Sequence, residues 1–89
     1  MEKTWSDEAW EDYESWQGKK GDPKKLKKIS ELLKDIERNG NNGIGHPEAL
    51  TGDLAGFWSR HIDDEHRLIY RIHEGKIEIM NCRTHYGDK

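Results

Sequence analysis

The chain has 89 residues, of which 31% are hydrophobic and 37% are charged, and its formal net charge at pH 7 is -3. This length predicts one domain, residues 1–89, with a small core, and the four Trp and three Tyr favour a packed domain over a disordered chain. The negative balance argues against a protein that binds polyanions over its whole surface, although one face can still carry a local basic site.

The first 18 residues predict a short strand and a helix. Residues 1–5 fit an edge strand, and Ser6 is a good N-cap for a helix that ends at Gly18. Four side chains of this helix lie three and four residues apart on one side: Trp10, Tyr13, Trp16 and Gln17. Core packing is the simplest use of such a stripe.

A second helix is predicted between Asp22-Pro23, an N-cap and first-turn pair, and Asn39-Gly40, a helix stop. Its apolar positions form one stripe: Leu26, Ile29, Leu33 and Ile36. Its first turns also carry the densest basic cluster of the N-terminal half: Lys24, Lys25, Lys27 and Lys28. A solvated helix face is the default reading of these lysines, and contact with a phosphate backbone is the alternative.

The second half of the chain reads as strands. Residues 39–45 are rich in Gly and Asn, so they separate the helices from this half, and Pro47 stiffens the approach to Glu48. Residues 56–72 predict an antiparallel hairpin around an acidic turn, and residues 76–83 predict a last strand.

The alternation of side chains in the second strand of the hairpin separates two faces. One face carries Leu68, Tyr70 and Ile72, and the other carries Arg67, Ile69 and Arg71. The order of elements predicts an α+β fold, in which a short N-terminal strand and a two-helix hairpin pack on a small antiparallel sheet.

All five histidines lie between positions 46 and 85, which raises metal binding and acid-base chemistry as candidates. Their spacing provides no close pair on one helix and Cys82 is the only cysteine, so no metal site and no cofactor are predicted. Cys82 itself lies in an apolar run and is expected to be a buried, inert thiol. Glu48 can act as a base, a histidine as an acid, and several arginines can offset charge on phosphorus: Arg60, Arg67, Arg71 and Arg83.

Five segments in sequence order resemble the YoeB (Txe) toxins of the RelE superfamily. They are the Trp-Ser-Asp-Glu-Ala-Trp-Glu-Asp-Tyr of residues 5–13, the Gly-x-Gly-x-Pro-Glu-x-Leu of residues 43–50, the Leu-x-Gly-Phe-Trp-Ser-Arg of residues 54–60, the Glu-His-Arg-Leu-Ile-Tyr of residues 65–70 and the Cys-Arg-x-His-Tyr of residues 82–86. The resemblance implies a microbial-ribonuclease-like domain, the toxin of a type II toxin-antitoxin system, that cleaves mRNA in the ribosomal A site. It also implies a YefM/Axe-like antitoxin partner and a tendency to dimerise.

Carried over residue by residue, the resemblance implies Glu48 as general base, Arg67 as phosphate-stabilising group, His85 as general acid and Tyr86 as a base-stacking or positioning residue. Such a site needs no metal, because the RNA supplies its own nucleophile, the 2′-hydroxyl. Its attack yields a 2′,3′-cyclic phosphate and a 5′-hydroxyl.

Further contacts with substrate phosphates are expected from four residues: Arg60, His61, Arg71 and Arg83. The chain departs from the pattern of its relatives at Ile44, Thr51 and His61, where they often carry a cation, and in the short polar tail of residues 87–89.

An alternative role is a binding module that, together with the antitoxin, represses its own promoter DNA. The chain has no apolar segment long enough for a membrane span and no apolar signal segment, so a soluble cytoplasmic protein is expected.

Overall fold

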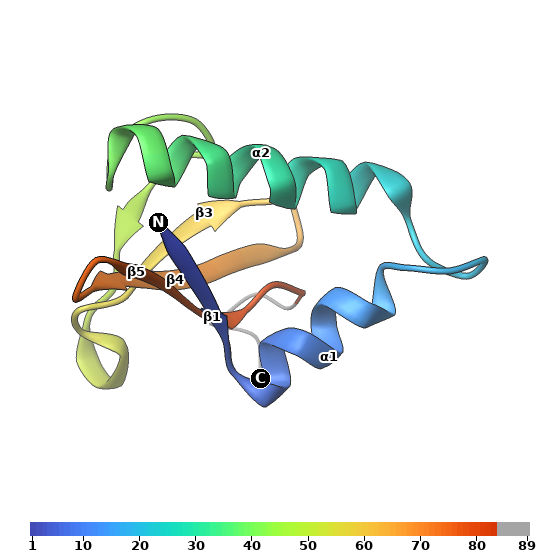
Figure 1. Cartoon of the computed structure of the whole chain (residues 1–89), viewed down its shortest axis with the longest axis horizontal. Coiled ribbons are helices and arrows are strands. Elements are labelled where there is room, and N and C mark those ends of the chain that lie inside the picture. The colour runs from blue at the N-terminus through green and yellow to red at the C-terminus, as the bar shows by residue number, and fades with distance from the viewer. Residues whose placement is uncertain (84–89) are drawn as a thin grey trace.

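The computed structural model describes residues 1–83, which form two helices and a five-stranded sheet (Figure 1). The elements in chain order are β1 (Glu2–Trp5), α1 (Asp7–Ser15), α2 (Pro23–Asn39), β2 (Glu48–Ala49), the short 3₁₀ helix η1 (Gly52–Leu54), β3 (Trp58–His61), β4 (Arg67–His73) and β5 (Lys76–Asn81). The predicted α+β class is confirmed, and the hairpin of β3 and β4 turns at the predicted acidic residues.

The sheet is mixed, which corrects the prediction of an antiparallel sheet. Its strand order is β1-β5-β4-β3-β2, and only β1 runs parallel to its neighbour, pairing Glu2 with Lys76 and Trp5 with Ile79. A parallel pair needs a long crossover connection, and here nearly the whole chain lies between the two strands. The alternation of side chains is the same in parallel and antiparallel strands, so the sequence pattern could not reveal this direction.

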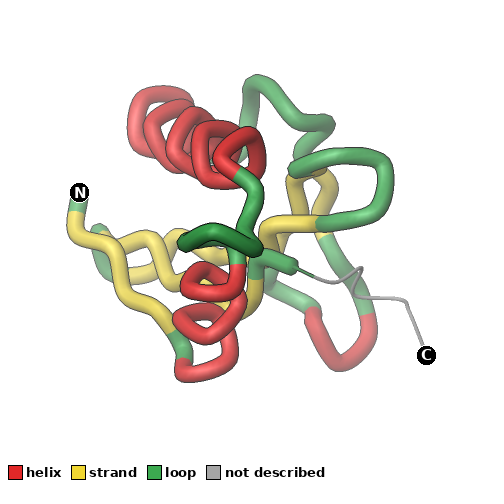
Figure 2. Tube along the Cα trace, turned by 90° about the vertical axis from the view of Figure 1, so that its right-hand side faces the viewer, coloured by secondary structure: helices red, strands yellow, loops and turns green. Residues whose placement is uncertain are grey.

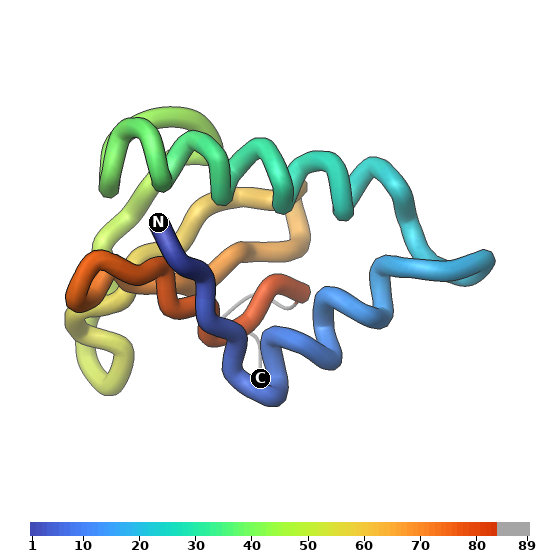
Figure 3. Tube along the Cα trace, in the orientation of Figure 1, coloured from blue at the N-terminus to red at the C-terminus, as the bar shows by residue number. Residues whose placement is uncertain are grey.

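The helix boundaries follow the predicted caps, with one difference. Ser6 Oγ accepts a hydrogen bond from Ala9 N at 3.0 Å, and Asp22 caps α2. Helix α1 ends at Ser15 rather than at Gly18, because the carbonyl of Trp16 accepts a hydrogen bond from Asp22 N at 2.8 Å across the following loop. Figure 3 shows this loop projecting away from the body before the chain returns in α2.

Both helices contribute to one core on one face of the sheet. The buried residues of α2 are Ile29, Leu32, Leu33 and Ile36. They form one cluster with Ala9 of α1, with Trp16 at the C-cap of α1, and with the sheet residues Leu68, Tyr70, Ile77 and Ile79. Figure 2 looks nearly along α2 and shows the two helices as separate coils. The predicted placement of the helices on one sheet face is therefore confirmed, and neither helix covers the opposite face.

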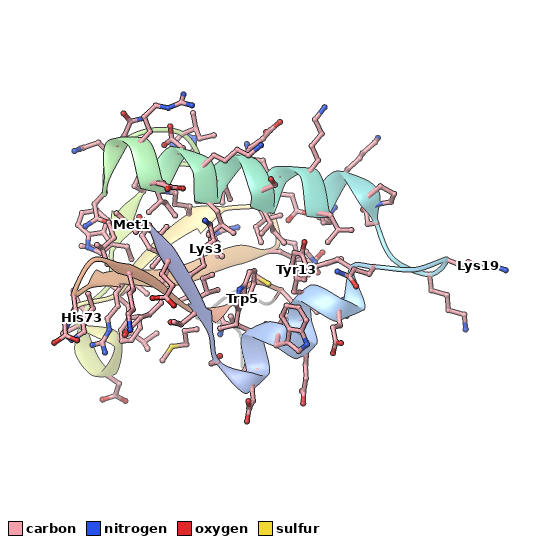
Figure 4. All side chains as sticks on the ribbon, viewed as in Figure 1. Met1, Lys3, Trp5, Tyr13, Lys19 and His73 are labelled. Carbon is pink, nitrogen blue, oxygen red and sulfur yellow. The ribbon has the colours of Figure 1, made fainter. Side chains whose placement is uncertain are left out.

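The aromatic stripe of α1 is only partly core, which corrects the sequence interpretation. Trp16 is buried, but Trp10 is 45% exposed. Trp10 packs instead beside Trp5 and Tyr13, with ring centroids 5.8 and 5.7 Å away. Figure 4 shows Trp5 and Tyr13 close together between β1 and α1. Helical spacing correctly placed these rings on one side, but it could not show that Trp10 would pack on Trp5 and Tyr13 at the surface instead of in the core.

Arg60 is a fully buried residue of β3 on the helix-facing side of the sheet. Its five N–H groups each have an acceptor: Tyr70 Oη, Asp35 Oδ2 and the carbonyls of Gly40, Asn42 and Ile44. The Asp35 contact is 2.6 Å long, and it is the largest cause of the lowered pKa of that carboxyl. This corrects the prediction that Arg60 contacts substrate, because its donors are used to hold the loop after α2 against β3.

Replacing Arg60 by Met should destabilise the fold by about 3 kcal/mol, because it removes the cation that pairs with Asp35 and the donor to three partly buried carbonyls. Arg71→Met is the matched control, since the partners Arg71 and Glu78 are 39% and 31% exposed and their pair contributes far less. Urea unfolding measures both losses. Equal losses in the two variants would contradict the structural role of Arg60.

Candidate functional site

The register of three strands gathers polar side chains on the sheet face away from the helices. Glu48 lies opposite Ser59 in the pair of β2 and β3, and His61 lies opposite Arg67 in the pair of β3 and β4. Directly opposed residues point to the same side of a sheet. Arg71 follows Arg67 by four residues on the same strand and so shares this face, as the sequence pattern predicted.

Glu48 is an exposed carboxylate at the start of the edge strand β2. The loop that leads to it is fixed by the Arg60 contacts and by a hydrogen bond from His61 N to Gly45 O of 2.7 Å. An exposed carboxylate on a fixed backbone can accept a proton from a bound molecule.

Arg67 is held at the end of the hairpin turn with only 9% of its surface exposed. Its Nη1 donates to the carbonyls of Asp63, Asp64 and His66 at 2.9, 3.3 and 3.2 Å. Among the described residues, Nη1 is the only guanidinium nitrogen of Arg67 with a hydrogen-bond partner. The carbonyls of the turn therefore orient the guanidinium of Arg67 by holding one of its edges.

Asp63 shapes the turn that orients Arg67. Its Oδ1 accepts hydrogen bonds from the backbone N of Glu65 and His66 at 2.8 and 2.6 Å, and its Oδ2 lies 2.9 Å from Lys25 Nζ. Burial alone would raise the pKa of Asp63, but these donors together lower it to about 2. Lys25, from the predicted basic cluster, therefore ties the start of α2 to the turn.

His61 lies among groups of both signs. Burial is the largest cause of its lowered pKa, and Arg67 and His46 lower it further, whereas Glu48 and Asp64 oppose the shift. His61 is therefore mainly a neutral imidazole at pH 7 in the free protein.

Arg71 and Arg83 are each engaged by neighbours. Arg71 Nε pairs with Glu78, and its guanidinium lies 5.1 Å from the centre of the Phe57 ring. Arg83 lies over the Trp16 ring at 4.4 Å and donates from Nη1 to Ser15 Oγ at 2.7 Å. Both cations are anchored away from Arg67, one along β4 and the other beside α1.

His85 and Tyr86, the predicted acid and positioning residue, lie outside the described residues, as does the tail of residues 87–89. The residues just before them are firmly held by α1. Cys82 N donates to Asp12 Oδ2, and Trp16 Nε1 donates to Cys82 O, both at 3.0 Å. Burial raises the pKa of the Cys82 thiol to about 12, which confirms the prediction of a buried and inert thiol.

Several residues of this arrangement escaped the sequence analysis. Asp35 and Tyr70 had no recognisable signal as partners of Arg60, because they lie 25 and 10 positions away in the chain. Asp63 did have a signal, since an Asp that begins a tight turn commonly accepts the backbone N–H groups that follow. Within residues 1–83, no three His, Cys, Asp or Glu side chains are arranged to hold a metal ion, and no helix is long and apolar enough to cross a membrane.

Comparison with known proteins defines the class of this small α+β domain. A family described as YoeB-like toxin of bacterial type II toxin-antitoxin systems matches residues 5–86. Toxin YoeB of Escherichia coli K12 is 46% identical over 97% of this chain and 100% of its own. A YoeB/ParE toxin from Agrobacterium tumefaciens, 41% identical, superimposes with a TM-score of 0.91 over 97% of this chain and 100% of its own.

YoeB of Staphylococcus aureus, solved as a dimer and in a heterotetrameric complex with YefM, is 47% identical to this chain. It superimposes with a TM-score of 0.88 over 97% of this chain and 98% of its own. Fold and sequence thus agree on a toxin of a type II toxin-antitoxin system. The chain belongs to the YoeB family.

Asp63 should make the stability of the protein depend on acidity between about pH 4 and pH 2. A carboxyl whose pKa is lowered on folding stabilises the folded state above its unfolded pKa, and this contribution is lost as the pH falls through the folded value. The stability difference between wild type and Asp63→Asn should therefore shrink over that range in urea unfolding. Asp53→Asn, an exposed position in η1, is the control, and a difference that stays constant with pH would refute the role of Asp63.

Proposed function

We propose that this toxin is a ribosome-dependent endoribonuclease that cleaves mRNA without a metal ion. The observation that carries the proposal is that an exposed carboxylate, Glu48, and an oriented guanidinium, Arg67, share the sheet face away from the helices in a member of the YoeB family. Their backbone positions are two strand spacings apart across the sheet and two residues apart along it, about 12 Å in all, which leaves room for a ribose and its phosphate between the side chains.

The reaction uses the 2′-hydroxyl of the RNA as nucleophile. Glu48 takes its proton, the 2′-oxygen attacks the adjacent phosphorus, and the bond from phosphorus to the 5′-oxygen of the next nucleotide breaks. Arg67 stabilises the charge on the phosphoryl oxygens with the guanidinium edge that the turn carbonyls leave open among the described residues. His85 protonates the departing oxygen, and Tyr86 positions the substrate. The ends are a 2′,3′-cyclic phosphate and a 5′-hydroxyl.

His61, Arg71 and Arg83 are proposed to contact other phosphates of the message or of ribosomal RNA. The contribution of each arginine to phosphate binding depends on the contacts that it already makes. Glu78 offsets the charge of Arg71, while Ser15 and Trp16 orient Arg83. Truncating such a contact should weaken binding and reduce its salt dependence rather than abolish the chemical step.

A YefM-like antitoxin is the proposed protein partner, supported by the complex that the S. aureus relative forms. Pairing of two toxin chains is proposed on the same grounds, from the dimer of that relative. Promoter DNA would be bound only through the toxin-antitoxin complex, so repression is a second role compatible with catalysis. The proposed site of action, on ribosomes and mRNA, is the cytoplasm.

Glu48→Gln and His85→Ala should each slow single-turnover cleavage of ribosome-bound mRNA by at least about 10²-fold, the usual value of one acid-base group. Both variants should keep the unfolding midpoint and the antitoxin affinity of wild type. Glu74→Gln, in the exposed turn between β4 and β5, is the matched control and should cleave normally. Cleavage by Glu48→Gln or His85→Ala within a few-fold of this control would reject the assigned roles.

A further inference from the structure

We propose that His46 and His61 together form a second phosphate-binding position beside Glu48, which gains its positive charge by taking up a proton when the phosphate binds. The inference rests on the proposed function for the identity of the ligand, an RNA phosphodiester. It adds His46, which the sequence analysis did not assign to the site.

The two imidazole rings lie next to each other at the edge of the site. Their centroids are 5.2 Å apart and their planes are inclined by 55°. His46 comes two residues before Glu48, and His61 lies two residues beyond Ser59, the partner of Glu48 on β3, so the pair lies next to Glu48 on one side. Two imidazoles at this separation can both donate N–H groups to the oxygens of one phosphate.

The backbone beneath the pair is fixed. His61 N donates to Gly45 O at 2.7 Å, which ties the loop to β3 directly before His46. Gly45 itself has a φ of +82°, and a Cβ there would lie 2.7 Å from Leu32 Cδ2 and 3.3 Å from Arg60 Cβ. The close packing of this glycine therefore determines where the next residue, His46, begins.

His46 also has an unusual backbone conformation. Its φ is +54°, which non-glycine residues rarely adopt, and residues that precede a proline normally favour extended backbone. Glu74, the other non-glycine residue with positive φ among those described, lies in the tight turn between β4 and β5, which accounts for it. No such turn accounts for His46, and backbone strain of this kind concentrates at functional sites.

The charges around the pair explain why a proton-dependent cation suits the position. The groups that face His61 are Arg67 from β4, His46 from the loop, Glu48 from β2 and Asp64 from the hairpin turn. Burial and the two nearby basic groups lower the pKa of His61, so the free site carries little charge there at pH 7.

A bound phosphate reverses this balance, because its negative charge favours the imidazolium form. Binding and protonation are then linked, and each strengthens the other by the same factor. Phosphate affinity should therefore rise as the pH falls, and the pKa of His61 should rise when the phosphate binds.

The experiment uses the full chain and a short 2′-O-methyl RNA, which the proposed reaction cannot cleave and whose phosphodiesters do not titrate between pH 5 and 8. Imidazole NMR signals report the pKa of each histidine with and without the oligonucleotide. A rise of about one unit for His61 corresponds to binding that is about five- to sevenfold tighter at pH 5.5 than at pH 8.

Variants separate the pair from the other histidines. His46→Gln and His61→Gln should each flatten the pH dependence of binding, and His61→Arg should bind tightly at every pH in the range. His73→Gln is the matched control, because His73 lies exposed at the far end of β4 (Figure 4) and should leave the dependence intact. If His46→Gln fails to fold, His61→Arg still decides the matter.

Binding by wild type that does not change with pH, or a pH dependence that His61→Arg retains, would overturn the inference. A chain that binds the oligonucleotide with this dependence but does not cleave ribosome-bound mRNA would reject the proposed function alone. A chain that cleaves mRNA but binds without the dependence would reject the histidine pair alone.

Discussion

The architecture of the site depends on one buried guanidinium. Arg60 stands inside the protein with every N–H group bonded, and its acceptors come from α2, from the loop after α2 and from β4. A charge in such a place is tolerated only because Asp35 balances it and the carbonyls complete its hydrogen bonds. The result is that a glycine-rich loop, which has little structure of its own, becomes a rigid lead into β2 and Glu48.

The two arginines of β3 and β4 that approach the turn have opposite uses, although they look alike in the sequence. Arg60 points to the helix side and serves the fold, whereas Arg67 points to the opposite side and, among the described residues, is held by the turn carbonyls along one edge only. The alternation of a strand separates these roles. The turn itself depends on the Asp63 carboxylate, which accepts backbone hydrogen bonds within it. Both candidate groups are therefore positioned by loops that a charged side chain stabilises: Arg60 in the loop before Glu48, and Asp63 in the turn before Arg67.

The sequence was sufficient for the helix caps and for the faces of one strand, where the signal was local. Ser6 and Asp22 cap their helices as predicted, Gly40 ends α2, and the two faces of β4 follow from the order of its residues. Prediction from the sequence failed where the structure depends on residues far apart in the chain. Examples are the parallel pairing of β1 with β5 and the buried ion pair of Arg60 with Asp35. A motif indicates that an arginine belongs near the site, but only the three-dimensional contacts show whether its donors remain available.

The central claim is that the nucleophile belongs to the RNA and not to water, and the most direct measurement is the chemistry of the cut ends. A message that carries a single 2′-deoxy nucleotide on the 5′ side of the cleaved phosphate should bind to ribosomes and toxin but remain intact. The unmodified message should yield a 2′,3′-cyclic phosphate and a 5′-hydroxyl. Cleavage of the deoxy message, or a 5′-phosphate on the product, would show that an activated water attacks and would contradict the account.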